Sequence, residues 1–154
     1  MAKNLQIDSL DRRILSFLTK DARMPFLEVA RECGVSGAAI HQRVQKLIND
    51  GVITGSEFTV DPAKIGYKTS CYIGIYLETA NLFEEVVEDL RKIAEIVECH
   101  YTTGIYAIFI KVYAKDNNDL RTVLADKLQA IKGISRTETF ISLQEVFKKH
   151  LPVD

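Results

Sequence analysis

Residues 36–49 form the first stretch whose side chains suit contact with another molecule. From Ile40 to Ile48 the apolar residues recur at helical spacing, so one side of a helix would be buried. Ser36 can cap that helix, because its hydroxyl accepts a hydrogen bond from a backbone N–H of the first turn. No acidic residue occurs between Glu32 and Asp50. The outward side would carry Ala38, Ala39, Gln42, Lys46 and Asn49, with His41 and Arg43 on its flanks.

A helix with such an uncharged-to-basic outer side suits the major groove of DNA. Gln42 could read adenine through its amide, and Arg43 and Lys46 could contact phosphates or guanine edges. The alternative is a helical hairpin with a solvated polar face, because helix-turn-helix patterns also occur by chance. The pattern alone leaves both interpretations open.

The segment Cys99–Val112 is the second candidate. At its centre, Tyr101–Tyr106 would place backbone N–H groups, threonine hydroxyls and phenols at an exposed turn. Gly104 would let the backbone approach a bound group. Such a turn could hold the carboxylate and the amino group of a small zwitterion. An ordinary hairpin tip is the alternative, since Gly and Thr are common there for conformational reasons.

No residue pattern for catalysis or metal binding stands out. His41, His100 and His150 lie in three different predicted elements, and no HExxH or CxxC spacing occurs. Cys99 and His100 are neighbours on a predicted strand, so their side chains point to opposite faces. Glycine-rich phosphate-binding motifs and nucleophile motifs are missing as well. We therefore expect no catalytic residue, no cofactor and no metal.

The composition is that of a globular protein, as one average domain or two small ones. Of 154 residues 47% are hydrophobic and 27% are charged, and the net charge is −1. Any DNA contact would therefore be a local patch. No apolar run reaches the length of a membrane span, and the first residues, MAKNLQIDSLDRR, lack the apolar core of a signal peptide. We expect a cytoplasmic protein without a membrane partner, in which the three cysteines stay reduced.

Residues 1–60 are predicted to form a winged helix-turn-helix domain. Three helical patterns follow one another there. Residues 52–60 then alternate in the way typical of extended structure and would supply the β wing. The residues expected to start or stop the helices are Asp8 or Ser9, Pro25, Ser36 and Gly51.

Residues 61–69 carry the turn-forming and helix-breaking residues of a linker. Residues 70–154 are predicted to form a ferredoxin-like domain in which strands and helices follow in the order βαββαβ. The predicted strands are 70–78, 96–102, 106–114 and 135–146, and the predicted helices are 82–94 and 117–131, the second capped by Asn117 or Asn118. The fold class is therefore α+β.

Both faces of that predicted sheet would be apolar. The helices of a βαββαβ unit cover one face only, and the other face should be polar if it met water. The residues expected on one face are Ile73, Ile75, Leu77, Ile108, Ile110, Val112, Ile141 and Leu143, and those on the other are Tyr72, Tyr76, Phe109 and Phe140. Because a monomer rarely exposes so large an apolar patch, we predict at least a dimer. A dimer would also present two recognition helices to successive half-sites on DNA.

Four segments resemble the Lrp/AsnC family of feast/famine transcriptional regulators: LDRRIL, DARMPFLEVARECGVSGAAIHQRVQKLINDGVITG, ECHYTTGIYAIFIKV and SRTETFISLQEV. The likeness runs from about Leu10 to Val146, and it is closest to the asparagine-responsive branch in IGYKTSCYIGIYLETA and HYTTGIYAIFIKV. The resemblance implies a sequence-specific regulator with an N-terminal winged helix-turn-helix and a C-terminal effector-binding domain. It also implies homodimers assembled through their sheets and commonly joined into octamers, with a free amino acid bound between dimers.

The resemblance also implies roles for particular residues. The DNA-binding residues would be Ser36, Ala38, Ala39, Gln42, Arg43 and Lys46. The effector-binding residues would be Tyr101, Thr103, Gly104, Ile105, Tyr106, Ala107 and, from a neighbouring subunit, Gln129. Many relatives carry acidic residues at the positions of Ile105 and Ala107. Their absence would leave more of the recognition to backbone groups, Thr103 and Gln129. Asparagine is the first choice of effector.

Two other functions are alternatives. Sirohaem decarboxylases resemble the same family and share the two-domain plan, but they need functional histidines around a tetrapyrrole cavity. His100 lies in the matching domain without an evident partner in the sequence. The other alternative is an oligomeric DNA-organising protein that binds no effector.

Overall fold

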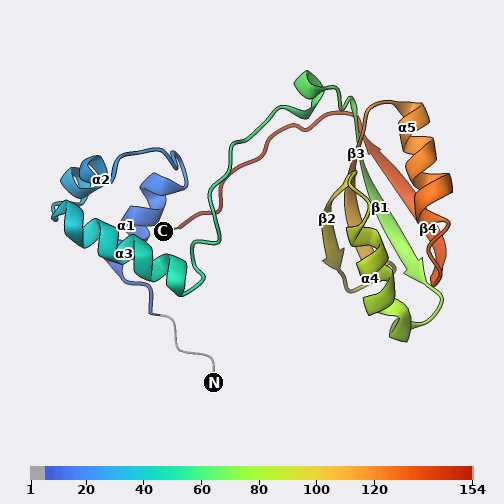
Figure 1. Ribbon diagram of the computed structural model, residues 1–154, viewed down its shortest axis with the longest axis horizontal. Coiled ribbons are helices and arrows are strands. Elements are labelled where there is room, and N and C mark those ends of the chain that lie inside the picture. Colours follow the sequence, from blue (N-terminus) through green and yellow to red (C-terminus); the bar gives the residue numbers. More distant parts are fainter. Residues whose placement is uncertain (1–5, 154) are drawn as a thin grey trace. The chain divides into compact units, whose positions relative to one another are not determined.

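The computed structural model describes residues 6–153, so the outermost residues of both predicted domains, 1–5 and 154, lie outside the described part. The chain divides into two compact units (Figure 1). The first contains the residues up to Thr59 together with the segment from Phe147, and the second is Val60–Val146. Between residues 6 and 153, no helix is long and apolar enough to cross a membrane.

The first unit contains three helices. α1 spans Ser9–Leu18, α2 spans Phe26–Cys33 and α3 spans Gly37–Asn49. Gly34 ends α2 in the left-handed conformation, with φ of 70°, and so turns the chain into α3. The predicted helix-turn-helix is confirmed.

The apolar stripes of these helices meet in one core. Ile14, Val29 and Ile40, one from each helix, have no exposed surface. The start of α1 is fixed by a capping box. The carboxylate of Asp8 accepts a hydrogen bond from the N–H of Asp11 at 2.8 Å, and the carboxylate of Asp11 accepts one from the N–H of Asp8 at 3.2 Å.

Residues 52–60, expected to be the β wing, form no strand. All strands of the described part belong to the second unit. Residues 52–60 therefore have no neighbouring strand to satisfy their backbone groups, and a lone strand is not stable in water. Phe58 is 73% exposed there, and its ring centroid lies 4.3 Å from the guanidinium carbon of Arg23. The alternation in the sequence is real, but it did not identify a paired strand.

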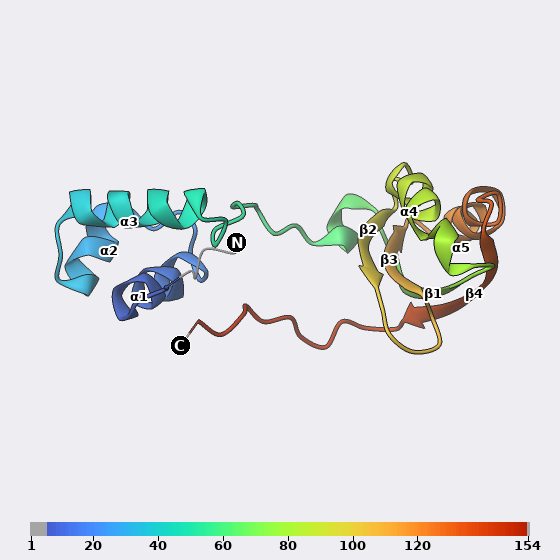
Figure 2. The same ribbon diagram turned by 90° about the horizontal axis from the view of Figure 1, so that it is seen from below.

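The second unit is a four-stranded antiparallel sheet in the order β2-β3-β1-β4. Its strands are β1 (Thr69–Leu77), β2 (Ile96–Tyr101), β3 (Ile108–Ala114) and β4 (Ile134–Ser142). Its helices are α4 (Phe83–Arg91) and α5 (Asn117–Thr122), the second continued by a π-helical segment, Val123–Leu128, and short 3-10 helices cover Pro62–Ile65 and Ala80–Leu82. Figure 2 shows α4 and α5 on the same side of the sheet. The predicted βαββαβ order and the α+β class are confirmed.

The cap of α5 and the end of β4 differ from the predictions. α5 is capped by Asp116, whose side chain accepts a hydrogen bond from the N–H of Asp119 at 2.9 Å, and not by Asn117 or Asn118. β4 ends at Ser142 because its partner there is Ser70, near the start of β1.

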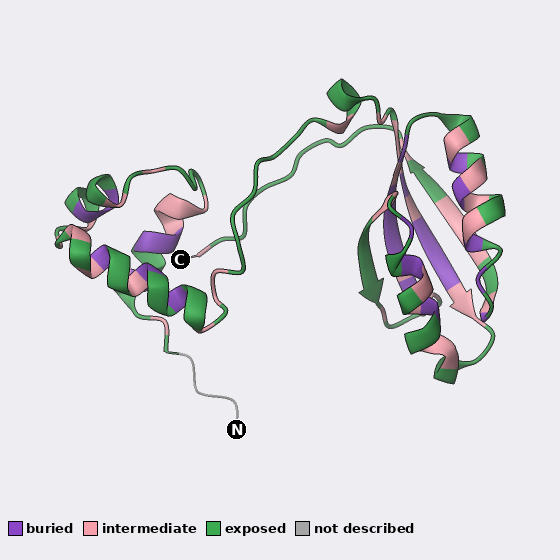
Figure 3. Cartoon of the chain, viewed as in Figure 1, coloured by how far each residue is buried: buried purple, intermediate pink, exposed green. Residues whose placement is uncertain are grey.

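The sheet face toward the helices is the core of this unit (Figure 3). Its fully buried strand residues are Cys71, Ile73, Ile75, Ile108, Ile110, Val112 and Ala114. Ile141 and Leu143 were expected there too, but they are 53% and 97% exposed. Ile141 lies next to the end of an edge strand and Leu143 lies beyond it. The opposite face, called the open face below, carries a cluster of rings in mutual contact: Tyr72, Tyr76, Tyr106, Phe109 and Phe140.

Candidate DNA-binding and ligand-binding sites

α3 presents the surface predicted to bind DNA. The hydroxyl of Ser36 accepts a hydrogen bond from the N–H of Ala39 at 3.2 Å and so caps the helix as expected. Ser36, Ala38, Gln42 and Lys46 are exposed, and Ala39 is half-buried. Within the described residues Lys46 takes part in no ion pair, so its charge is available to a partner.

Arg43 differs from the other predicted DNA-binding residues. Its guanidinium bonds the carboxylate of Asp8 and also that of Asp11, at 3.1 Å. Asp11 is only 2% exposed. The hydrogen bond from Arg43 is the main cause that lowers the pKa of Asp8 below its ordinary value. Arg43 therefore links α3 to the capped start of α1, and its charge is already balanced by two carboxylates.

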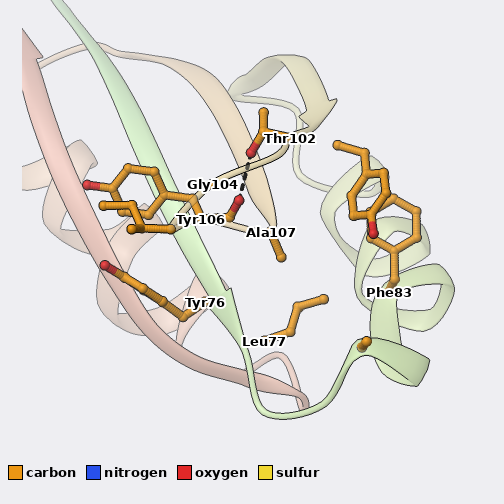
Figure 4. Close-up of a pocket in the computed structure, with 10 residues that line it drawn as sticks. Tyr76, Leu77, Phe83, Thr102, Gly104, Tyr106 and Ala107 are labelled. Atoms are coloured by element: carbon orange, nitrogen blue, oxygen red, sulfur yellow. Dashed lines mark hydrogen bonds between the residues drawn. The ribbon is translucent and has the colours of Figure 1, made fainter.

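A pocket of about 320 Å³ opens beside the turn between β2 and β3 (Figure 4). The predicted effector residues that line it are Tyr101, Gly104, Ile105, Tyr106 and Ala107. The lining residues that were not predicted are Tyr76, Leu77, Ala80, Phe83 and Thr102. None of the lining side chains carries a charge at neutral pH. The polar groups available to a ligand are therefore hydroxyls and the backbone of the turn.

Hydrogen bonds fix the shape of this turn. The hydroxyl of Thr102 donates to the carbonyl of Tyr106 at 2.7 Å, and the N–H of Thr102 donates to the carbonyl of Ala107 at 3.0 Å. Gly104 has φ of 107°, a conformation that other residues adopt only under strain. The N–H of Ala107 also donates to the carbonyl of Ile75 on β1 at 3.0 Å. Hydrogen bonds thus join the two ends of the turn to each other and join the turn to the neighbouring strand β1.

Two tyrosines that line the pocket, Tyr101 and Tyr106, are held in place by different neighbours. Tyr101 packs against Phe83 at the start of α4, with ring centroids 4.5 Å apart. Tyr106 meets Tyr76 edge-on at 5.2 Å, and its hydroxyl donates to Glu138 Oε2 at 2.7 Å. That hydrogen bond to a carboxylate is the main cause that raises the pKa of Tyr106 to about 12.

Two predicted effector residues lie outside the pocket lining. Thr103 is exposed on the turn, and Thr102 takes the structural role in its place. Gln129 is exposed at the end of the π-helical segment that continues α5. The missed wall residues from β1 and α4 had only an apolar core pattern in the sequence, and the strand order is what brings them to the turn.

These features define a DNA-binding regulator with a separate ligand-binding domain. Residues 7–48 match the AsnC-type helix-turn-helix domain, and residues 70–152 match the Lrp/AsnC ligand binding domain. The chain belongs to the Lrp/AsnC family of transcriptional regulators.

Individual relatives cover almost the whole chain. The chain is 48% identical over 138 residues to Regulatory protein AsnC of Haemophilus influenzae, with 90% of this chain and 92% of that protein covered. It is 43% identical over 142 residues to Regulatory protein AsnC of Escherichia coli, with 92% and 93% covered. The solved structure of Escherichia coli AsnC has a TM-score of 0.91 at 40% identity, covering 96% of this chain and 99% of that one. A Neisseria meningitidis transcriptional regulator solved with L-methionine has the same fold, with a TM-score of 0.87 at 19% identity and 93% and 94% covered.

Proposed function

We propose that this regulator changes its binding to DNA when a free amino acid, asparagine as first choice, occupies the pocket at the β2–β3 turn. The observation that carries the proposal is the position of that pocket beside the TTGIY turn, in the domain that matches the family's ligand-binding model. The two relatives named AsnC support the choice of asparagine. We also propose that the protein acts in the cytoplasm, where a regulator of bacterial type meets DNA.

For DNA we propose that α3 enters the major groove. Gln42 would read adenine, Lys46 would contact a phosphate, and Ala38 would meet a thymine methyl group. Ser36 and Ala39 would bring the start of the helix close to the DNA backbone. Arg43 would support this surface through Asp8 and Asp11, instead of contacting DNA as its position on the helix suggests.

For the effector we propose recognition mainly by the backbone. Because no carboxylate lines the pocket, the ligand's amino group would be bound by carbonyl groups of the turn and its carboxylate by N–H groups. Tyr101 and Ile105 would cover the ligand from the exposed side. Gln129 lies outside this pocket and would reach a ligand only from a second copy of the chain.

We propose that the chain assembles through the open face of the sheet. Phe140 is 48% exposed there, within the ring cluster, and covering that cluster would remove apolar surface from water. The dimer would pair two recognition helices. An octamer is the proposed larger assembly, with the effector bound between dimers.

Calorimetric titration with asparagine tests the effector site. Wild type should give a binding heat, and Gly104→Asp should give none, because a carboxylate at the turn repels the ligand's carboxylate and strains a residue at φ 107°. The matched control is Gly66→Asp. Gly66 has a similar φ of 100°, and no atom lies within 4 Å of a Cβ there, but it caps the 3-10 helix Pro62–Ile65 and does not line the pocket. The proposal fails if no common amino acid binds wild type, or if Gly104→Asp binds as wild type does.

A further inference from the structure

Tyr106 belongs to two surfaces of the second unit. Tyr106 is one of the residues that line the pocket, as are Gly104 and Ala107. Its ring lies in the cluster on the open face, with centroid distances of 5.2 Å to Tyr76, 5.9 Å to Phe109 and 6.2 Å to Phe140. In Figure 4 the hydroxyls of Tyr106 and Tyr76 both point toward β4, away from Phe83 at the other wall of the pocket. A ligand in the pocket and a partner on the open face would therefore both meet Tyr106.

Gly74 leaves the space on β1 in which the Tyr106 ring packs. A Cβ at position 74 would lie 2.4 Å from Cδ1 of Tyr106 and 2.6 Å from two further ring carbons. Glycine in the middle of a strand weakens the strand, and it is found where another group approaches closely. Any other residue on β1 at this position would push the Tyr106 ring off the sheet.

Glu138 holds the far end of the ring. It pairs with Gly74 across β1 and β4, which brings its carboxylate to the hydroxyl of Tyr106 at 2.7 Å and to that of Tyr76 at 3.2 Å. Arg136 bonds the same carboxylate and lies over the Tyr76 ring at 4.4 Å from its centroid. Hydrogen bonds, above all that from Tyr106, lower the pKa of Glu138 and keep it charged.

We propose that Gly74 and Glu138 are positioning residues that set Tyr106 in the pocket wall from the open face, so that ligand binding and assembly act on the same ring. The inference rests on the proposed function, and it names the residues that would couple effector binding in the pocket to assembly through the open face. A ligand that stabilises one position of the Tyr106 ring also stabilises the arrangement of the open face that contains the ring in that position. The ligand would thereby change the affinity of the open face for a second copy of the chain. By linkage, assembly then changes ligand affinity by the same factor.

Gly74→Ala tests whether the space at Gly74 positions the Tyr106 ring. Gly55→Ala is the matched control, because no atom lies within 4 Å of a Cβ there. We expect the dissociation constant for asparagine to rise about ten-fold or more in Gly74→Ala, as overpacking displaces the ring, and to stay unchanged in Gly55→Ala. A folded Gly74→Ala protein that binds like wild type overturns the inference and leaves the proposed function standing. A wild-type protein that binds no amino acid overturns both.

Glu138→Gln tests the link without crowding the sheet, and Glu84→Gln on α4 removes an equivalent charge elsewhere. The measured quantity is the ratio of the self-association constants with and without asparagine. Wild type and Glu84→Gln should share one ratio, on the order of 5 to 150 for a coupled system, while Glu138→Gln should approach one. In wild type the hydrogen bond to Glu138 raises the pKa of Tyr106 to about 12. A difference titration of the tyrosines should show a lower pKa for Tyr106 in Glu138→Gln. If Glu138→Gln lowers stability but keeps the wild-type ratio, Glu138 is structural only and the inference fails.

Discussion

Arg43 lies on α3, yet its bonding partners are the capping residue Asp8 and Asp11 of α1. The sequence places it on the flank of an outward, basic side, where contact with DNA is the natural expectation. In the structure it bonds Asp8 and Asp11, and the second of these carboxylates is almost fully buried. A charge held this way is costly to remove, because a buried partner would be left without its counter-ion.

At the residue scale we therefore predict different effects for the two basic residues of α3. Lys46→Gln should weaken DNA binding and reduce the slope of log affinity against log salt by about 1, the loss of one phosphate contact. Arg43→Gln should lower the melting temperature and leave that slope unchanged. Salt titrations of DNA affinity measure the slope, and Lys92→Gln, in the second unit and paired with Asp89, is the control. A slope reduced by Arg43→Gln as well would mean that Arg43 contacts DNA.

The pH dependence of stability provides a second test of this ion pair. The pKa of Asp8 is lowered in the folded chain, first by its hydrogen bond with Arg43. Its contribution to stability is therefore complete above the ordinary aspartate pKa and is lost as pH falls through the lowered value. Denaturant unfolding should show Asp8→Asn less stable than wild type near neutral pH, with the difference closing below about pH 4. Glu57→Gln should give no such difference, and a gap that persists at acid pH would contradict the role of the Asp8 charge.

At the scale of elements, the sequence pattern predicts type and order well. Helical spacing from Ile40 to Leu47 and the alternation along β1 each reflect one buried side, and the structure confirms both. Ile48, expected on the same buried side of α3, is 45% exposed. Residues 52–60 also alternate, but alternation does not supply a neighbouring strand. The pocket was predictable only at its turn, where Gly104 marks a special backbone. Its other wall comes from Leu77 and Phe83, whose apolar character looks like any core residue until the strand order is known.

The junction between α5 and β4 gives an element-scale prediction. Gly133 has φ of 95°, and a Cβ there would lie 3.1 Å from both Leu82 and Val86. Gly133→Ala should lower the free energy of unfolding by about 1–3 kcal/mol through backbone strain and crowding. Gly55→Ala, with open space around it, should change it little. Denaturant melts of the two variants make the comparison, and equal stability would show that the junction adjusts freely.

At the scale of the whole molecule, one unit carries the recognition helix and the other carries the pocket and the open face. Family membership accounts for this division. A single α3 offers few groups that read bases, since its first turn is Gly37, Ala38 and Ala39. Binding by one copy should therefore be weak, and pairing through the open face would supply the second helix. The proposed effector controls the protein only if its site communicates with that assembly.

The most direct test of this account is the affinity of the full chain for DNA selected from a random pool, measured by fluorescence anisotropy with and without saturating asparagine. The account predicts that asparagine, or another amino acid of a panel, changes the dissociation constant by about 5- to 150-fold. The change should disappear in Gly104→Asp and persist in Gly66→Asp. An affinity for DNA that stays the same with every amino acid tested would contradict the account.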